Sequence, residues 1–503
     1  MSSKKKSYLL TTIMTVCAVL LLAGVTLGPV LGCGGGVSEA IPKSQIGNDT
    51  GLSTDTINNE AFKEKFPKQY ESYMQNGPAG GDQEHPSKFV DDNQPLLPAL
   101  WFSNAFSKDY NERRGHGFAI EDVTNTLRTN EDTAGGCLTC KSSAVPKLIA
   151  EKGEAYYTDK LFSDIMPAAD EMGQSPVGCS DCHDPATMEL RPVRPHFVKG
   201  LESRGIDLAN ANQKDMQSYV CGQCHSTYFF YPETKEVTVP WAHLNLPRQT
   251  MRNELFPTAQ SQPGDYALEM YAYFQNEGAA AGFKGDFVHG ISGAHIFKPR
   301  HPEFENSHEG SHKDLSCSDC HMPTVTTGEG EDMVKFTNHH LGSPLENPEP
   351  CMGCHSTDMD KRVEAARKMQ ASYKEKLLEA QYQSLLTHYY VNRMITAGAD
   401  ADLIAELQTN IGYAQWLWDL NAAENGNGFH NPAGADRLLN LSIESSTDTL
   451  AKATEALQDK GVDISELKAR IADVITAMKN EPDTSKKRDF ASNDYFPDQT
   501  PAP

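Results

Sequence analysis

Apolar residues recur every three to five positions through a long stretch of the C-terminal third, over residues 358–397. This spacing places them along one face, so it predicts one long amphipathic helix. The same period predicts three further helices, over 402–421, 435–459 and 465–480, and Ser465 gives only a weak capping signal for the last. Such long helices usually pack on one another. The apolar residues of the first helix are Met369, Tyr373, Leu377, Tyr382, Leu385, Tyr389 and Met394.

Residues 1–33 have the pattern of an export segment. Three consecutive lysines, Lys4 to Lys6, precede an uncharged stretch from Ser7 to Gly32, in the manner of the charged and hydrophobic regions of a signal peptide. We therefore predict export to the periplasm. The stretch is long for a cleaved signal, so an uncleaved anchor stays open, as does a lipidated Cys33 after a loosely matching lipoprotein box. Residues 34–60 contain few large apolar side chains and are predicted to form a tether.

The central region, residues 61–357, is rich in loop-forming residues. The 503-residue chain contains 38 Gly and 29 Pro, and only 38% of it is hydrophobic. A mean hydropathy of −0.53 excludes a multi-span membrane protein, and a net charge of −23 argues against binding of nucleic acid. A loop-rich chain with a modest apolar fraction needs another source of order, such as cofactors. We predict a mainly α, loop-rich protein with little β structure and a disordered tail over residues 481–503.

The cysteines indicate what that source of order is. Outside the leader, ten cysteines form five C-x-x-C pairs with none left over. The next residue is a histidine in four of the pairs, and C-x-x-C-H is the attachment sequence of c-type haem, whose two cysteines bind the haem covalently while the histidine binds its iron. The pairs and following residues are Cys137, Cys140 and Lys141; Cys179, Cys182 and His183; Cys221, Cys224 and His225; Cys317, Cys320 and His321; and Cys351, Cys354 and His355.

Other uses of C-x-x-C pairs fit this pattern poorly. Disulfides between cysteines three apart would close very short loops and constrain little. A structural zinc ion needs four ligands, usually from two pairs, and five pairs do not divide into such sets. A thioredoxin-like motif would occur once, next to a βαβ pattern. The sequence therefore predicts a pentahaem cytochrome c.

The first pair differs from the others because Lys141 follows it. A haem that only carries electrons is well served by two strong axial ligands, and 13 other histidines are available as second ligands. A lysine must lose its proton to bind iron, which is a costly choice for a simple electron carrier. Lys141 therefore marks the predicted catalytic haem. The alternative is that Lys141 is a solvated neighbour and that another residue binds this iron.

One C-x-x-C-K and four C-x-x-C-H motifs resemble the pentahaem ammonia-forming cytochrome c nitrite reductases, and further motifs match in order over roughly residues 85–435. The resemblance implies four distal haem ligands. These are His116 in Arg114-Gly-His116 for the third haem, His339 in Thr337-Asn-His339 for the second, His430 in Phe429-His430-Asn-Pro432 for the fourth, and His312 in Gly310-Ser-His312 for the fifth. His308, His340 and His388 remain alternatives to His312, His339 and His430 respectively.

The same resemblance implies three catalytic residues. Leu127-Arg128-Thr129 is similar to the segment with the active-site arginine, and Tyr228 matches the catalytic tyrosine. Lys298-Pro-Arg300-His301-Pro-Glu303 resembles K-x-Q-H-P-E, which makes His301 the catalytic histidine. The implied reaction is the six-electron reduction of nitrite to ammonium at the Lys141 haem, with four bis-histidine haems supplying electrons. A non-enzymatic electron carrier would instead have five low-spin haems.

The family also implies partners and a quaternary structure. The long-helix region, residues 358–480, is expected to pack on the haem core and form a homodimer interface, and a membrane-anchored, quinol-oxidising multihaem cytochrome is the expected electron donor. The sequence leaves open which donor this is, the haem potentials, and the use of hydroxylamine, nitric oxide or sulfite.

The chain departs from the family pattern at the calcium site. Most members hold Ca²⁺ beside the active site with a glutamate two residues after the third haem motif and with the lysine and glutamine of K-x-Q-H. Thr227 and Arg300 stand at the glutamate and glutamine positions here. The formal charge of glutamate with Ca²⁺ is +1, and so is that of threonine with arginine. A guanidinium also offers five hydrogen-bond donors to the carbonyls that the ion would bind. We therefore predict no calcium, with Arg300 in its place. The alternative is an Arg300 that points to solvent.

Overall fold

The computed structural model describes residues 49–77, 94–110, 115–240, 262–278, 285–328, 330, 333–355, 358–483 and 486. The expected leader, Cys33 and Arg114 lie outside the described residues, as does nearly all of the tail beyond residue 483. Within the described residues, no helix is both long enough and apolar enough to cross a membrane.

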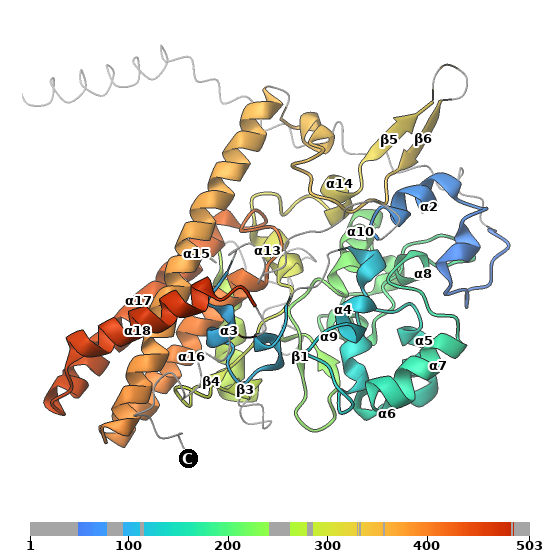
Figure 1. The fold of residues 1–503 in the computed structure, drawn as a ribbon. Helices are drawn as coiled ribbons and strands as arrows, with labels where there is room; N and C mark the ends of the chain where they lie inside the picture. Colours follow the sequence, from blue (N-terminus) through green and yellow to red (C-terminus); the bar gives the residue numbers. More distant parts are fainter. Residues whose placement is uncertain are drawn as a thin grey trace, which may run out of the picture.

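Long helices make up the C-terminal third, as predicted. They are α15 (Met359–Thr396), α16 (Ala401–Ala423), α17 (Pro432–Asp459) and α18 (Ile464–Asn480). Figure 1 shows them as an orange and red bundle on one side of the molecule. Their apolar faces form the largest core cluster, which also includes Trp101 and Leu97 from the N-terminal half. The long-helix region therefore packs on the rest of the chain.

Two details of the helical pattern differ from expectation. Tyr382 was expected on the buried face of α15, but its side chain is exposed. It follows the buried Leu377 by five residues, and a step of five turns a helix by about 140° from the starting face. At α18, Ser465 lies inside the helix, and the cap is Asp463, whose carboxylate accepts hydrogen bonds from the backbone N–H of Ser465 and Glu466.

The rest of the described chain consists of short helices and loops. Proline within the first two helical positions starts several of them, where its missing N–H costs nothing. The helices are α2 (Pro67–Met74), α3 (Leu97–Leu100), α4 (Glu121–Thr124), α5 (Val145–Lys152), α6 (Ala155–Thr158), α7 (Met166–Glu171), α8 (Cys179–Cys182), α9 (Pro195–Ser203), α10 (Gln213–Gly222), α12 (Asp265–Tyr273), α13 (Glu303–Glu309) and α14 (Cys317–His321).

The β structure of the described residues is limited to three antiparallel pairs, in agreement with the predicted mainly α class. They are β1 (Phe229–Phe230) with β2 (Val237–Thr238), β3 (Phe287–Val288) with β4 (His295–Ile296), and β5 (Thr324–Thr327) with β6 (Val334–Thr337). The β5–β6 pair, in which Thr324 lies opposite Thr337, projects from the top of the molecule in Figure 1.

The described part of the expected tether contacts the body of the protein. The hydroxyl of Thr50 donates to the carbonyl oxygen of Pro185 at 2.6 Å, and the backbone N–H of Asn59 donates to the Ser175 hydroxyl at 3.0 Å. Both Thr50 and Asn59 are buried. Residues 49–60 therefore belong to the packed body, next to the second haem motif.

Candidate haem-binding and active site

Four pairs of histidine rings lie at nearly equal separations. The ring centroids are 6.4 Å apart for His116 and His225, and 6.3 Å apart for His183 and His339. The separation is 6.2 Å both for His321 with His430 and for His312 with His355. Each pair joins one histidine of a C-x-x-C-H motif to the distal histidine that the sequence assigned to it. The structure thus brings together all four expected pairs.

This spacing fits a metal ion bound between two imidazoles. A metal–nitrogen bond to histidine is about 2 Å long, so two rings on opposite sides of one ion have centres about 6 Å apart. Burial lowers the pKa of His116, His321 and His339 to about 4, which keeps these rings in the neutral form that binds metals. The residues present therefore fit four haem irons, each with two axial histidines.

Most of these histidines have a second partner that orients the ring. Nδ1 of His183 lies 2.9 Å from the Met188 carbonyl oxygen, and Nδ1 of His339 lies 2.8 Å from that of Thr337. Nδ1 of His430 contacts the buried carboxylate of Glu424 instead. When Nδ1 is held in this way, Nε2 is left to bind the metal.

Three histidines that the sequence left open as alternatives have other contacts. His308 packs on Phe304, with ring centroids 4.3 Å apart. His340 follows His339 directly and lies against Gly342. His388 is fully buried in α15, where it stacks on His289 with centroids 3.7 Å apart. The ring distances thus favour His312, His339 and His430 as the distal partners.

Two glycines explain how the distal segments come so close to other parts of the chain. Gly115, just before His116, has φ +124°, and a Cβ there would lie 2.3 Å from the Asn76 carbonyl oxygen. A Cβ on Gly310 would lie 1.8 Å from the carbonyl oxygen of His430. Only glycine fits such approaches. The segments that present the fourth and fifth distal histidines are therefore in direct contact.

The haem motifs themselves pack against one another. None of the ten cysteines of the five motifs forms a disulfide in the described part of the chain. The thiols of Cys140 and Cys224 contact each other, and so do those of Cys221 and Cys317. The first motif therefore touches the third, and the third touches the fourth.

A buried polar cluster ties the first three motifs together, and nothing in the sequence pattern indicated it. The guanidinium of Arg194 is fully buried and donates to Asp181 Oδ1 at 2.6 Å and to the Ser142 carbonyl oxygen at 3.0 Å. The side-chain amide of Gln223 donates to the Asp181 carbonyl oxygen at 2.7 Å, and its Oε1 accepts from the backbone N–H of Arg194 at 3.0 Å. Ser142, Asp181 and Gln223 lie in or beside the first, second and third motifs.

The surroundings of the first motif differ from those of the other four. Nζ of Lys141 lies 3.1 Å from Asp122 Oδ2. To bind iron, this amine would have to give up both its proton and this ion pair. The backbone carbonyl oxygen of Asp122 also accepts a hydrogen bond of 2.8 Å from Arg128 Nη2. Asp122 therefore connects the expected iron ligand to the expected active-site arginine.

Two aromatic rings lie close to the Arg128 guanidinium. Its guanidinium lies 4.8 Å from the ring centroid of Phe106 and 5.3 Å from that of Tyr110. Cys137 is exposed, and the positive charges of Arg300 and Arg128 act on its thiol. Two cations, Arg128 and Arg300, therefore lie near the first haem motif, where Arg300 is paired with Asp286 and Lys141 with Asp122.

Tyr228 and His301 complete the expected catalytic set. Burial raises the pKa of the Tyr228 hydroxyl, although the charge of Arg300 opposes the rise, so the tyrosine keeps its proton. The His301 backbone has φ +49°, a conformation that costs energy in residues other than glycine and is common at functional sites. Its ring centroid is 5.6 Å from that of His225, which brings the expected catalytic histidine next to the third haem motif.

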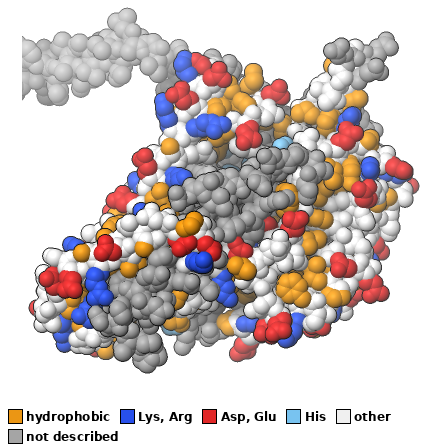
Figure 2. Space-filling model, viewed as in Figure 1, with side chains coloured by type: hydrophobic (Ala, Val, Ile, Leu, Met, Phe, Trp, Pro, Cys, Tyr) orange, Lys and Arg blue, Asp and Glu red, His pale blue; other side chains and the backbone are white. Residues whose placement is uncertain are grey.

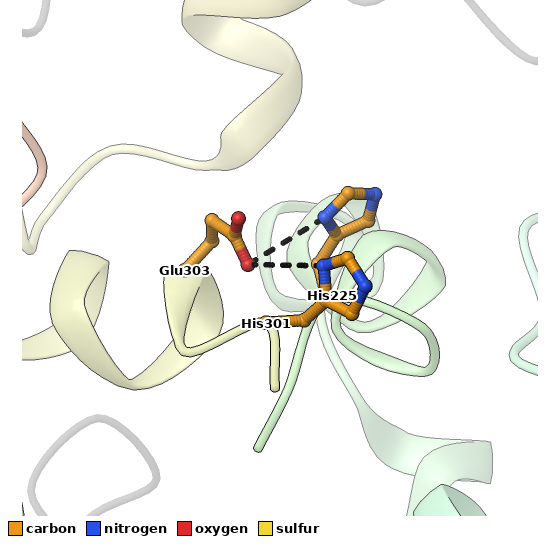
Figure 3. A group of neighbouring side chains, drawn as sticks. All are labelled: His225, His301 and Glu303. Atoms are coloured by element: carbon orange, nitrogen blue, oxygen red, sulfur yellow. Dashed lines mark ion pairs between the residues drawn. The ribbon is translucent and has the colours of Figure 1, made fainter. Parts of the chain in front are cut away.

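Glu303 lies between these two histidines, as Figure 3 shows. Its Oε2 is 3.7 Å from Nδ1 of His225 and 3.9 Å from Nδ1 of His301. Burial raises the pKa of Glu303, but the two imidazoles more than offset this effect and leave the pKa well below its usual range. The carboxylate is therefore charged. Sequence analysis gave Glu303 no role, although it is the last residue of the H-P-E segment.

Arg300 lies in the protein rather than in solvent. Its Nη1 donates to the Lys298 carbonyl oxygen at 2.8 Å, and its Nη2 donates to Asp286 Oδ1 at 3.0 Å. The guanidinium also lies 5.5 Å from the ring centroid of Tyr228. Thr227 is buried, and its backbone N–H donates to Glu305 Oε1 at 2.9 Å. The solvent-facing alternative for Arg300 is therefore wrong, because its side chain is largely buried and bonded on two sides.

Known proteins resemble this chain over most of its length. The profile of the cytochrome c552 family matches residues 58–501. Cytochrome c-552 of Aliarcobacter butzleri is 32% identical over 430 residues, covering 80% of this chain and 78% of that protein, and cytochrome c-552 of Bacteroides thetaiotaomicron is 30% identical over 416 residues, with the same coverage. A solved structure, cytochrome c nitrite reductase from Desulfovibrio desulfuricans, has two calcium sites in the structure of its catalytic subunit. It matches with 27% identity and a TM-score of 0.68 over 83% of this chain and 91% of that one.

Proposed function

The chain belongs to the cytochrome c552 family, and from this premise we propose that it is a pentahaem nitrite reductase that converts nitrite to ammonium with six electrons. One observation carries the proposal. Four haem motifs have a histidine ring opposite their own at 6.2 to 6.4 Å. The first motif has Lys141 instead, which Asp122 links to Arg128, and Tyr228 is close enough to Cys137 and Cys140 to interact with them electrostatically. This contrast supports four electron-transfer haems and one substrate-binding haem.

Haem c supplies an iron that accepts electrons one at a time and, where one axial position is open, binds a small ligand. Lys141 would hold the first haem, and the histidine pairs described above would hold the other four. Covalent attachment through ten cysteines would fix all five in place.

Three side chains of this protein act on the substrate in the proposed reaction. Arg128, oriented by the Asp122 carbonyl oxygen and two aromatic rings, holds the nitrite anion and stabilises charge on its oxygens as the N–O bonds break. Tyr228 keeps its proton because desolvation raises its pKa, and it donates a hydrogen bond to the same oxygens. His301 supplies protons from beside the third motif.

We also propose that this reductase works without calcium. Arg300 binds the Lys298 carbonyl oxygen, and the lysine of K-x-Q-H takes part in the calcium site of most family members. One acidic side chain at this point, Asp286, is already bonded to Arg300 and to the Lys298 backbone N–H. A cation added here would meet the fixed positive charge of Arg300. The relative from Desulfovibrio desulfuricans has calcium sites, so this feature would distinguish the two proteins.

The family resemblance also supports a cellular setting. We propose that the protein acts in the periplasm as a homodimer formed through the long helices, and that a membrane-anchored, quinol-oxidising multihaem cytochrome reduces it. Acidic and basic side chains are interspersed over the long helices in the coloured part of the face shown in Figure 2.

Electron paramagnetic resonance of the holoenzyme tests the proposed division of labour. We expect one high-spin ferric haem, whose signal changes when nitrite is added, together with low-spin signals from the bis-histidine haems. Five low-spin haems that ignore nitrite would instead indicate an electron carrier.

A further inference from the structure

Glu303 differs from the other groups around the active site because it faces two expected functional histidines at once. It is the first residue of α13, and its side chain is nine-tenths buried. His225, His301 and Glu303 form a tight cluster in which the candidate ligand atoms all lie within 4.8 Å of one another. Figure 3 shows both rings turned with Nδ1 toward the same carboxylate oxygen.

The orientation of the carboxylate is fixed from its other side. Oε1 accepts hydrogen bonds from the backbone N–H of Asn425 at 2.9 Å and from its side-chain amide at 2.5 Å. Oε2 accepts no hydrogen bond from the described residues and is left facing the two imidazoles. Asn425 precedes the loop that carries His430, so Glu303 is held by a part of the chain far from its own.

The consequences for His225 follow from imidazole chemistry. A neutral histidine that binds a metal through Nε2 carries its proton on Nδ1. Nδ1 of His225 lies 3.7 Å from the charged carboxylate, beyond hydrogen-bond distance, so Glu303 acts on the ring as a nearby negative charge that increases its electron donation. His183 and His339, the pair expected for the second haem, face only carbonyl oxygens through Nδ1. The third haem should therefore be harder to reduce because of Glu303.

The consequences for His301 are geometric. Its backbone is in the left-handed region, a conformation that persists only where the surrounding structure holds it. A carboxylate facing Nδ1 favours a proton on that nitrogen and turns Nε2 away from Glu303. The same charge thus positions the imidazole that the proposed reaction uses.

We propose that Glu303 is a positioning residue shared by the axial histidine of the third haem and the active-site histidine, setting the donor strength of His225 and the orientation of His301 together. The inference concerning His301 rests on the proposed nitrite reduction, whereas that concerning His225 rests only on haem binding. One side chain therefore links an electron-transfer haem to the residue that delivers protons.

The test compares Glu303→Gln with a matched variant, Glu424→Gln, in the holoenzyme. Glu424 also places a carboxylate against an axial histidine, His430, and its other oxygen is likewise held by a backbone N–H, that of Gly428 at 2.8 Å. Both substitutions remove a charge while keeping the shape. A third variant, His116→Met, changes only the distal ligand of the third haem and so identifies its spectroscopic signal.

A redox titration followed by absorbance and electron paramagnetic resonance should show the third haem moving to a more positive potential in Glu303→Gln. In Glu424→Gln the fourth haem should move and the third should stay. With nitrite and an artificial reductant, kcat of Glu303→Gln should fall about tenfold, part of the effect of removing a positioned acid, while KM for nitrite changes less.

An unchanged third-haem potential would overturn the proposal, because a residue that only holds the Asn425 loop would not alter that potential. A shifted potential with wild-type nitrite kinetics would also overturn it, because the role would not be shared. If the wild-type protein does not reduce nitrite at all, the proposed function fails instead. The potential shift then still decides whether Glu303 acts on His225.

Discussion

Lys141 is the residue on which the proposed chemistry most depends, and it has a competing partner in Asp122. We predict that Lys141→His keeps all five haems, because the cysteines attach them, but lowers nitrite turnover about tenfold or more. An imidazole donates to iron differently from an amine. Changes around a metal typically lower activity about 10- to 100-fold. Haem content by absorbance and turnover with a viologen dye provide the test. A variant that turns over at the wild-type rate would show that Lys141 has no special role.

His301 provides a second prediction at the same scale. His301→Asn should leave the absorbance of the five haems unchanged and lower kcat about 100-fold, the usual contribution of a positioned proton donor. The structure places His301 beside His225, not opposite it as a ligand. Loss of one haem from the purified variant would mean instead that His301 is an axial ligand.

Arg300 gives a prediction about metal content. Dialysis against EDTA should leave activity unchanged, and elemental analysis should find no stoichiometric calcium, because the guanidinium already binds Asp286 and the Lys298 carbonyl oxygen. Arg300→Gln should lower activity, with no rescue by Ca²⁺ unless Thr227→Glu is made as well. Activity that is lost on chelation and restored by calcium would disprove the idea.

The residues that sequence could find are those inside short motifs. The resemblance proposed four distal histidines, and each one lies opposite its expected partner. Glu303 lies inside such a motif, but its role, like that of Arg194, comes from contacts between segments far apart in the chain, such as Glu303 with Asn425 and Arg194 with Ser142. A single sequence contains no signal for such contacts.

At the scale of elements, the apolar period predicted the four long helices to within a few residues. The period does not show which residue caps a helix, and the cap of α18 is Asp463 rather than Ser465. The period also placed Tyr382 on the buried face of α15, where its side chain does not lie. The short helices around the haem motifs could not be predicted in this way. They are too short for a period, and α8 and α14 instead begin at aspartate capping interactions inside C-S-D-C.

The packing of α15 against α16 predicts a dependence of stability on pH. His388 of α15 is buried between Ser292, at 2.8 Å, and Gln415 of α16, at 2.9 Å, and it stacks on His289. Burial lowers the pKa of His388 to about 4 from its ordinary value of 6.5. The unfolded chain therefore binds a proton more readily than the folded one between these values, and stability should fall as the pH drops from 6.5 to 4.

The free energy of unfolding should fall by about 3 kcal/mol because of this group, since a shift of one pKa unit corresponds to about 1.4 kcal/mol. Melting temperatures of the wild type and of His388→Gln, measured from pH 7 to pH 4, provide the comparison. We expect a shallower acid dependence in the variant, whatever its melting temperature at neutral pH. Equal slopes would show that His388 does not contribute.

At the scale of the whole molecule, composition excluded broad classes and the cysteine motifs indicated the chemistry. Although the net charge is −23, two arginines, Arg128 and Arg300, act on the first haem motif. Arg300 is paired with Asp286, so Arg128 is the one proposed to bind the anion. The homodimer, the electron donor and the periplasmic location stay predictions. They depend on surfaces and segments that no contact among the described residues tests.

The central claim concerns how many electrons one nitrite consumes, and a titration measures this directly. Reduced viologen is supplied in excess to the purified holoenzyme with a known amount of nitrite, and both the dye oxidised and the ammonium formed are counted. The account predicts six electrons consumed and one ammonium formed per nitrite. One electron per nitrite with release of nitric oxide, or no oxidation of the dye, would contradict it.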